Sequence, residues 1–177
     1  LIMNKSSISS ASEYRPKDFS DMIGQDAIVK TLSNAIKNDQ IPQALLFCGP
    51  RGVGKTSCAR ILAKQINDLE ENFEYNIFEL DAASNNSVED IRNITDQIRI
   101  PPQIGKYKVY IIDEVHMLSN AAFNAFLKSL EEPTKHVVFI LATTEKNKII
   151  PTILSRCQIY DFKKVDSSSI TKLLTSI

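Results

Sequence analysis

The chain has 177 residues, 43% of them hydrophobic, which is enough to bury one substantial core and predicts one main domain. Its 21 basic residues equal its 21 acidic residues, so the overall charge does not indicate a nucleic-acid partner. Cys48, Cys58 and Cys157 are too widely spaced for a disulfide framework and are typical of a cytoplasmic protein. The longest apolar run, 137–142, is far shorter than the roughly 20 residues that cross a bilayer, so we expect no membrane partner.

Short β-rich runs alternate with helical patterns along the chain, which predicts parallel strands joined by helical crossovers. In chain order, a helix is expected over 26–37 and an apolar strand over 44–47. Residues 49–56 then read Gly-Pro-Arg-Gly-Val-Gly-Lys-Thr, a complete phosphate-binding loop. The helix that follows this loop carries an apolar stripe, formed by Ala59, Leu62, Ala63 and Ile66.

The phosphate-binding loop makes nucleotide binding the first hypothesis. Its glycines let successive backbone N–H groups converge on the phosphates, and the following helix turns its positive dipole end toward them. Lys55 adds a positive charge, and the Thr56 hydroxyl is placed to bind Mg²⁺. The residues expected to bind the nucleotide in this segment are Gly49, Pro50, Arg51, Gly52, Val53, Gly54, Lys55, Thr56 and Ser57.

The next two strands lead to a pair of acids. Strand two is expected over 76–80, a helix begins after Ser87 with a pattern close to a capping box, and strand three covers 109–112. The third strand runs directly into Asp113 and Glu114, at the sheet edge where ligands bind in open α/β folds. Asp113 is the candidate to hold Mg²⁺, partly through water, and Glu114 is the candidate general base for the attacking water.

The rest of the chain continues the alternation. The predicted elements are a helix from near Ser119 to Pro133, a strand over 137–142, a short helix before Ser155 and a strand over 158–162. In the last strand, Ile159 and Phe162 are expected to face the core. Together the elements predict a three-layer α/β/α fold of the P-loop type with a five-stranded, mostly parallel sheet.

Three polar positions near the strand ends each allow two interpretations. Thr144 either finishes strand four or contacts the γ-phosphate. Arg156 is either a surface ion-pair partner or a group that reaches a phosphate. His116 either packs in the structure or acts as a base, and the structural interpretation is favoured because Glu114 already fills the role of base.

Several segments occur together in the order that is typical of one family. They are Tyr14-Arg15-Pro16, 23–25, 49–56, 79–85, 109–118, 130–133, 141–144 and 155–157. With these segments the chain resembles the clamp-loader branch of the AAA+ ATPases, as found in bacterial DNA polymerase III. The resemblance covers about residues 14–165.

The resemblance implies an ATPase that uses ATP and Mg²⁺ and acts with other clamp-loader subunits to open the sliding clamp and place it on primer-template DNA. It implies that Thr144 senses the γ-phosphate and that Arg156 acts in trans on the ATP of a neighbouring subunit. Helix starts would touch the DNA backbone, and 87–92 is the candidate segment. The residues implied to line the adenine pocket are Tyr14, Arg15, Ile23 and Gly24.

One departure from the family's pattern changes the expectation for metals. Many members carry a four-cysteine zinc module before strand two, whereas 67–75 is short, acidic and free of cysteine, so we expect no zinc site. We expect 1–13 to be a flexible leader, 14–165 to be the AAA+ domain and 166–177 to begin a helical lid domain. Without a lid or a neighbour's arginine, the isolated chain should hydrolyse ATP weakly or not at all.

Two other functions fit part of the pattern. A structural subunit that senses ATP without hydrolysing it would need the loop alone, but the intact Lys55, Thr56, Asp113 and Glu114 argue against it. Another AAA+ DNA motor, such as a Holliday-junction helicase subunit, would share the same core. Its motifs match the segment 79–85 less well.

Overall fold

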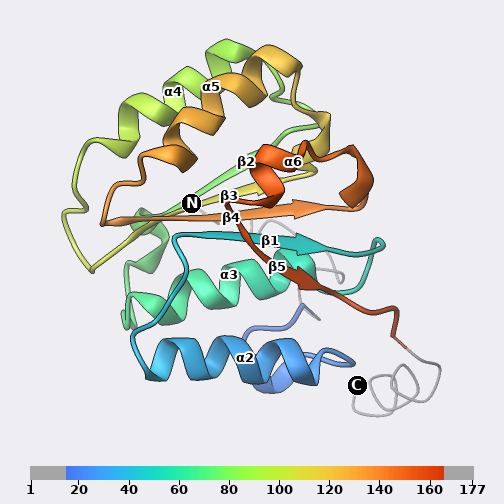
Figure 1. Ribbon diagram of the computed structural model, residues 1–177. Helices are drawn as coiled ribbons and strands as arrows, with labels where there is room; N and C mark the ends of the chain where they lie inside the picture. The colour runs from blue at the N-terminus through green and yellow to red at the C-terminus, as the bar shows by residue number, and fades with distance from the viewer. Residues whose placement is uncertain (1–14, 166–177) are drawn as a thin grey trace, which may run out of the picture.

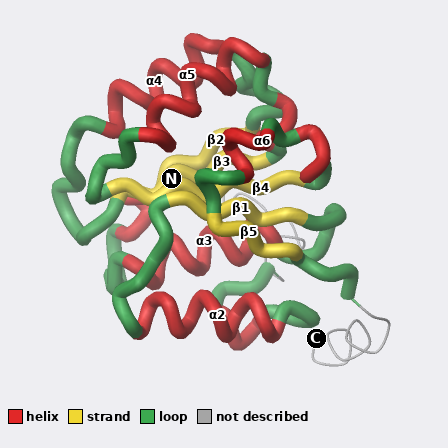
Figure 2. Tube along the Cα trace, in the orientation of Figure 1, coloured by secondary structure: helices red, strands yellow, loops and turns green. Residues whose placement is uncertain are grey.

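The computed structural model describes residues 15–165. The predictions for Tyr14, for the leader over 1–13 and for the lid helix over 166–177 therefore lie outside the described residues. Within the described part, the chain forms one parallel sheet between two layers of helices (Figures 1 and 2). No helix in this part of the chain is long and apolar enough to span a membrane.

The five strands of the sheet lie in the order β2-β3-β4-β1-β5, and every pairing is parallel. Strand β4 lies in the middle and is buried along its whole length. Because the strands are parallel, all their carboxyl ends meet at one edge of the sheet. The strands are β1 (Ala44–Cys48), β2 (Ile77–Asp81), β3 (Lys108–Asp113), β4 (Val137–Thr143) and β5 (Gln158–Asp161).

Helices cover both faces of the sheet, which explains why the central strands read as continuous apolar runs. In Figure 1, α2 (Asp26–Lys37) and α3 (Lys55–Ile66) lie below the sheet, and α4 (Val88–Ile98) and α5 (Asn120–Glu131) lie above it. Alternate residues of one strand enter opposite cores: Phe139 packs on the side of α5, and Ile140 packs on the side of α3. The predicted α/β/α class is confirmed.

The helix starts follow the sequence signals closely. The Ser87 hydroxyl accepts a hydrogen bond from the Asp90 N–H, and the Asp90 carboxylate accepts one from the Ser87 N–H, so the capping box forms with the shorter Asp. Ser119 caps α5 by accepting from the Ala122 N–H over 3.1 Å. The shorter elements are α6 (Pro151–Leu154) and the 3₁₀ helices Phe19–Asp21, Phe73–Asn76, Val115–Met117 and Lys146–Lys148.

The structure corrects two details of the predicted strands. Strand β2 begins one residue later than expected because Asn76 still belongs to a 3₁₀ helix and points its amide at another loop. In β5, Phe162 is buried as expected, but Ile159 is only half-buried and the deeply buried residue is Tyr160, whose ring packs edge-on against Phe47. Tyr160 and Phe162 face the core on the side of α2 and α3, and Ile159 packs on the opposite face, so alternation along the strand would have paired Phe162 with Tyr160 and not with Ile159.

Two buried asparagines fix the segment between α3 and β2. Asn67 accepts from the backbone N–H groups of Lys106 and Tyr107, at 3.0 and 2.7 Å, and donates to the Tyr107 carbonyl. Asn76 donates to the carbonyls of Ile104 and Tyr107 at 2.7 and 2.9 Å. No zinc module was expected in this segment. Hydrogen bonds from the side-chain amides of Asn67 and Asn76 anchor it to the loop over 104–107. Within residues 15–165 no three His, Cys, Asp or Glu side chains are grouped to hold a metal ion.

Candidate nucleotide-binding site

The predicted loop, acids and threonines meet at the carboxyl edge of the sheet. The loop follows β1, Asp113 ends β3 and Thr143 ends β4, and these three strands are neighbours. The Gly49 N–H donates to the Thr143 carbonyl over 3.2 Å, which joins the start of the loop to β4. The loop, Asp113 and Thr143 therefore lie at the same edge of the sheet, where the sequence predicted that these three segments would meet.

The end of the loop is held by residues from the segment before α2. Gly54 is the N-cap of α3 and has a φ of 96°, a conformation that side chains disfavour. A Cβ at Gly54 would lie 2.8 Å from the Met22 methyl carbon, so the close packing also requires glycine. The buried Gln25 side chain donates to the Val53 carbonyl at 3.3 Å and to the Lys163 carbonyl at 2.6 Å. It thereby ties the loop to the segment after β5.

Lys55 is buried within its own loop. Its side-chain amine donates to the Gly49 and Pro50 carbonyls, both at 2.6 Å, and the residue is only 6% exposed. Burial lowers the pKa of Lys55, while the carboxylates of Glu114 and Asp113 act in the opposite direction. The two carbonyls therefore hold the amine beside the start of the loop, and their hydrogen bonds compensate for its desolvation.

Thr56 and Asp113 form a pair that suits Mg²⁺. The Thr56 hydroxyl donates to the Asp113 carboxylate over 3.1 Å, and both residues are half-buried. The hydroxyl oxygen keeps its lone pairs while its proton is engaged. Mg²⁺ typically takes one or two protein oxygens and completes its shell with phosphate oxygens and water, so this donor set fits the ion.

Two features position the Glu114 side chain: a contact with Thr144, just after β4, and the backbone conformation of Glu114 itself. It has a φ of 51° in the left-handed region, which is uncommon for a non-glycine residue. Its Oε2 accepts a hydrogen bond from the Thr144 hydroxyl at 3.1 Å and lies 3.4 Å from His116 Nε2. The candidate base and the candidate γ-phosphate sensor are therefore in direct contact.

A pocket of about 470 Å³ opens beside the loop and the acids. Arg15 lines this pocket together with the loop residues, whereas Ile23 and Gly24 do not. Ile23 and Gly24 lie between Met22, which packs against Gly54, and Gln25, which donates to the Val53 carbonyl. The remaining lining residues include Arg60, whose guanidinium forms a bidentate pair with Glu79 at 2.6 and 2.8 Å. The predicted residues that line this pocket are Arg15, Arg51, Gly52, Gly54, Lys55, Thr56, Ser57, Asp113 and Glu114.

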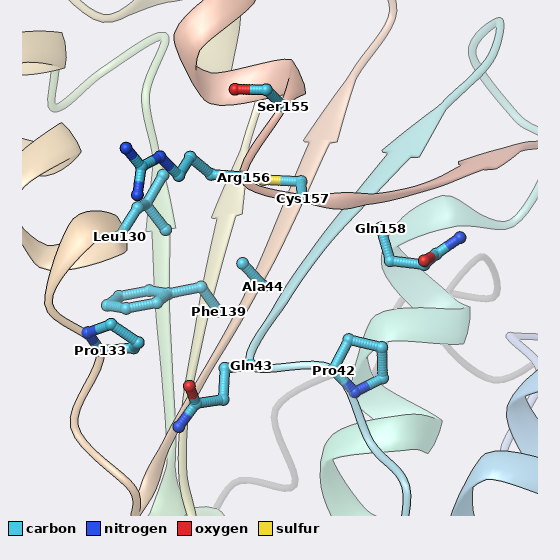
Figure 3. Close-up of a pocket in the computed structure, with 10 residues that line it drawn as sticks. All are labelled: Pro42, Gln43, Ala44, Leu130, Pro133, Phe139, Ser155, Arg156, Cys157 and Gln158. Carbon is cyan, nitrogen blue, oxygen red and sulfur yellow. The ribbon is translucent and has the colours of Figure 1, made fainter.

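Arg156 lies at the opposite edge of the sheet. It precedes β5, whose first residue, Gln158, pairs with Leu45 near the start of β1, whereas the loop follows the end of β1. Its exposed guanidinium is 3.7 Å from the Glu131 carboxylate. Figure 3 shows Arg156 beside Leu130 at the wall of a second pocket, of about 390 Å³. This position keeps Arg156 away from the loop of its own chain.

Two residues near the site, Gln25 and Arg60, were not singled out for it by the sequence, and a third, His116, was considered as a base and set aside. Gln25 holds the loop, Arg60 borders the pocket, and His116 contacts Glu114. The His116 side chain is 5% exposed, and its Nδ1 lies 2.8 Å from the Thr143 hydroxyl. The structural interpretation of His116 agrees with this burial, but the histidine touches the acid proposed as base.

A glycine-rich loop between the parallel strand β1 and a helix, with paired acids at the carboxyl end of β3, which only β4 separates from β1, defines the fold of a P-loop nucleoside triphosphatase. A family model described as DNA polymerase III, delta subunit, matches residues 24–166, and the chain belongs to this family. Individual relatives indicate which subunit it resembles. The chain is a homologue of the gamma/tau subunit of DNA polymerase III.

The sequence relatives are considerably longer than this chain. The chain is 48% identical, over 93% of its length, to DNA polymerase III subunit tau of Bacillus subtilis and covers 32% of that protein. It is 43% identical, over 94% of its length, to subunit tau of Escherichia coli and covers 29% of it. The chain thus spans about a third of the length of these relatives.

Solved structures support the fold. A variant of RuvB from Thermotoga maritima superposes with a TM-score of 0.74 at 22% identity, over 92% of this chain and 53% of RuvB. A DNA polymerase III, gamma subunit-related protein from the same organism gives a TM-score of 0.64 at 23% identity, over 77% of this chain and 47% of that one. At such low identity these similarities establish the architecture alone.

Proposed function

We propose that this chain is the ATP-binding and ATP-hydrolysing part of a DNA polymerase III clamp-loader subunit, which couples ATP binding to loading of the sliding clamp on primed DNA. The observation that carries the proposal is the contact set Lys55–loop, Thr56–Asp113 and Thr144–Glu114 at one sheet edge. The identity to tau subunits, about twice that to RuvB, favours a clamp loader over a Holliday-junction motor.

Each residue has a defined task in this proposal. The loop amides and Lys55 bind the phosphates of ATP, while Thr56 and Asp113 hold Mg²⁺, which would neutralise phosphate charge when bound. Glu114 orients the attacking water and accepts its proton. Thr144 detects the γ-phosphate by exchanging its contact with Glu114 for one with a phosphate oxygen.

The proposal also covers the assembly. Arg156 would act in trans on the ATP of a neighbouring clamp-loader subunit, because it lies at the sheet edge away from its own loop. ATP binding would drive the grip on clamp and DNA, and hydrolysis would release them. Residues 14–165 would form the AAA+ domain, after a leader over 1–13, and 166–177 would begin the lid.

The test compares Lys55→Ala and Glu114→Gln in the full-length protein assembled with its clamp-loader partners. Lys55→Ala should abolish both ATP binding and clamp-dependent turnover, while Glu114→Gln should retain ATP and lower turnover by at least about 100-fold. Lys37→Ala and Glu71→Gln, on exposed surface, serve as matched controls. Unchanged turnover in both site variants would reject the motor function. ATP binding by a wild-type complex that never hydrolyses it would support the nucleotide-sensing alternative.

A further inference from the structure

A series of polar contacts connects the end of β4 to Glu114. The Glu145 N–H donates to the Thr143 hydroxyl oxygen at 2.9 Å, and this oxygen is 2.8 Å from His116 Nδ1. On the other side of the ring, His116 Nε2 lies 3.4 Å from Glu114 Oε2. His116 therefore lies between the strand end and the candidate base.

The direction of these contacts follows from the Thr143 hydroxyl. Thr143 is fully buried, and its oxygen already accepts a hydrogen bond from the Glu145 N–H, so its own proton needs an acceptor. Within the described residues, His116 Nδ1 is the other group in hydrogen-bond contact with this hydroxyl and is the one that can accept its proton. With Nδ1 as the acceptor of the Thr143 proton, the ring hydrogen lies on Nε2, the nitrogen that is 3.4 Å from Glu114 Oε2.

Both contacts to Glu114 fall on the same carboxylate oxygen. Thr144 donates to Oε2 at 3.1 Å, and His116 Nε2 lies 3.4 Å from the same oxygen, whereas no donor within residues 15–165 contacts Oε1. The Thr144 hydroxyl has one proton, so it cannot serve Glu114 and a γ-phosphate together. When Thr144 turns to the phosphate, His116 is the described side chain that remains beside Oε2.

We infer that His116 is a positioning residue for ATP hydrolysis: it anchors Oε2 of Glu114 so that Oε1 is presented to the attacking water, with its tautomer set by Thr143. The inference rests on the proposed function, because it deepens the role of Glu114 there. The left-handed backbone at Glu114 adds to the need for an anchor, since a strained residue keeps its position only when its surroundings hold it.

The experiment measures single-turnover and steady-state ATP hydrolysis by the full-length protein in its clamp-loader complex. His116→Phe keeps the ring volume and removes both nitrogen contacts, and it should lower kcat by about 10- to 100-fold while KM changes by less than about threefold. His116→Gln places an N–H donor within reach of Glu114 and should recover most of the rate. His136→Phe, the same change at the opposite edge of β4, is the matched control.

The decisive readout is the double variant with Glu114→Gln. If His116 acts through Glu114, adding His116→Phe to Glu114→Gln should cost no further rate, because the group it positions is already disabled. Wild-type turnover in His116→Phe, or an equal loss in both backgrounds, would overturn the inference. Absence of hydrolysis in the wild-type complex would instead reject the proposed function, so the two failures are distinguishable.

Discussion

The Thr56 hydroxyl donates a hydrogen bond of 3.1 Å to the Asp113 carboxylate, although the two residues are 57 positions apart in the chain. The contact joins the first turn of α3 to the end of β3. Since the hydroxyl proton is given to Asp113, the lone pairs of Thr56 remain free for a cation. The pair thus orients the Thr56 oxygen as a cation ligand before ATP and Mg²⁺ bind, so less side-chain freedom is lost when they bind.

Replacing Thr56 by valine should weaken Mg²⁺-dependent ATP binding selectively. Thr56→Val removes the hydroxyl at nearly constant shape, so the affinity for ATP with Mg²⁺ should fall by about tenfold or more, which is the cost of one strong polar contact. With EDTA present, the affinity should match that of the wild type. Titration with a fluorescent ATP analogue under both conditions makes the comparison.

Thr56→Ser is the control for this prediction because it keeps the hydroxyl and should bind as the wild type does. An equal loss of affinity with and without Mg²⁺ in Thr56→Val would show that Thr56 contacts the nucleotide or supports the loop, and does not bind the cation.

The asparagine contacts between 67–76 and 104–107 should contribute measurably to stability. Asn76→Ala removes hydrogen bonds to two backbone carbonyls from a residue that is 2% exposed, and it should lower the free energy of unfolding by about 1–3 kcal/mol. Gly105→Ala should cost a similar amount, because Gly105 has a φ of 67° and a Cβ there would lie 2.8 Å from Asn76 Nδ2.

Urea denaturation of each variant measures these costs, with Asn34→Ala on the exposed side of α2 as the control. If Asn76→Ala were as stable as the wild type, the segment would have to be held by its apolar contacts, such as those of Ile77, and not by the amides.

The sequence predicted the parts of this molecule that depend on local patterns. Burial on both faces produces the apolar strand runs, and the caps at Ser87 and Ser119 are short-range, so these elements could be located. Because parallel strands end at a common edge, the meeting of the loop with Asp113 and Thr144 also followed.

The remaining features depend on contacts between residues that are distant in the chain. Asn67 and Tyr107 are 40 positions apart, and Gln25 and Lys163 are 138 apart, so no pattern of spacing in the sequence predicts their hydrogen bonds. His116 was set aside because Glu114 already explained the chemistry, and only the fold shows that its ring lies between Glu114 and Thr143.

Buried thiols should make the fold sensitive to alkali. Burial raises the pKa of Cys48 to about 11 and that of Cys58 to about 12, from an ordinary value of 9.0. In the unfolded chain these thiols lose their protons near pH 9, whereas in the fold they stay neutral up to about pH 11 and about pH 12. Between pH 9 and these folded-state pKa values, the unfolded state therefore binds fewer protons than the folded state. Their contribution to stability is complete below pH 9 and is lost as the pH rises toward 11 and 12.

The measurement is the free energy of unfolding from urea titrations at pH 8 and at pH 10.5. Cys58→Ala should start less stable at pH 8, because it removes a buried sulfur, but it should lose less stability than the wild type on going to pH 10.5. Cys157→Ala should reduce the alkaline loss by a similar amount, because burial also raises the pKa of Cys157, to about 11. Equal losses in wild type and Cys58→Ala would assign the alkaline sensitivity to other groups, such as Tyr110, whose pKa burial raises to about 12.

Arg156 should matter to turnover of the assembly and not to ATP binding by its own chain. It lies at the sheet edge opposite the loop, so Arg156→Ala should leave the ATP affinity of the isolated chain within about twofold of the wild type. In the assembled complex, the loss of a charge that stabilises the transition state should lower turnover by about 100-fold or more.

Arg51→Ala gives the contrasting result, because Arg51 lines the pocket of its own loop and should weaken ATP binding by the isolated chain. Arg156→Lys should recover little turnover, since an amine lacks the planar, forked donors of a guanidinium. A loss of ATP affinity in the isolated Arg156→Ala chain would place the arginine in cis. Full turnover of the Arg156→Ala complex would reject a catalytic role for Arg156. Its exposed ion pair with Glu131, at 3.7 Å, would then be its only role, because such a surface pair forms without any catalytic function.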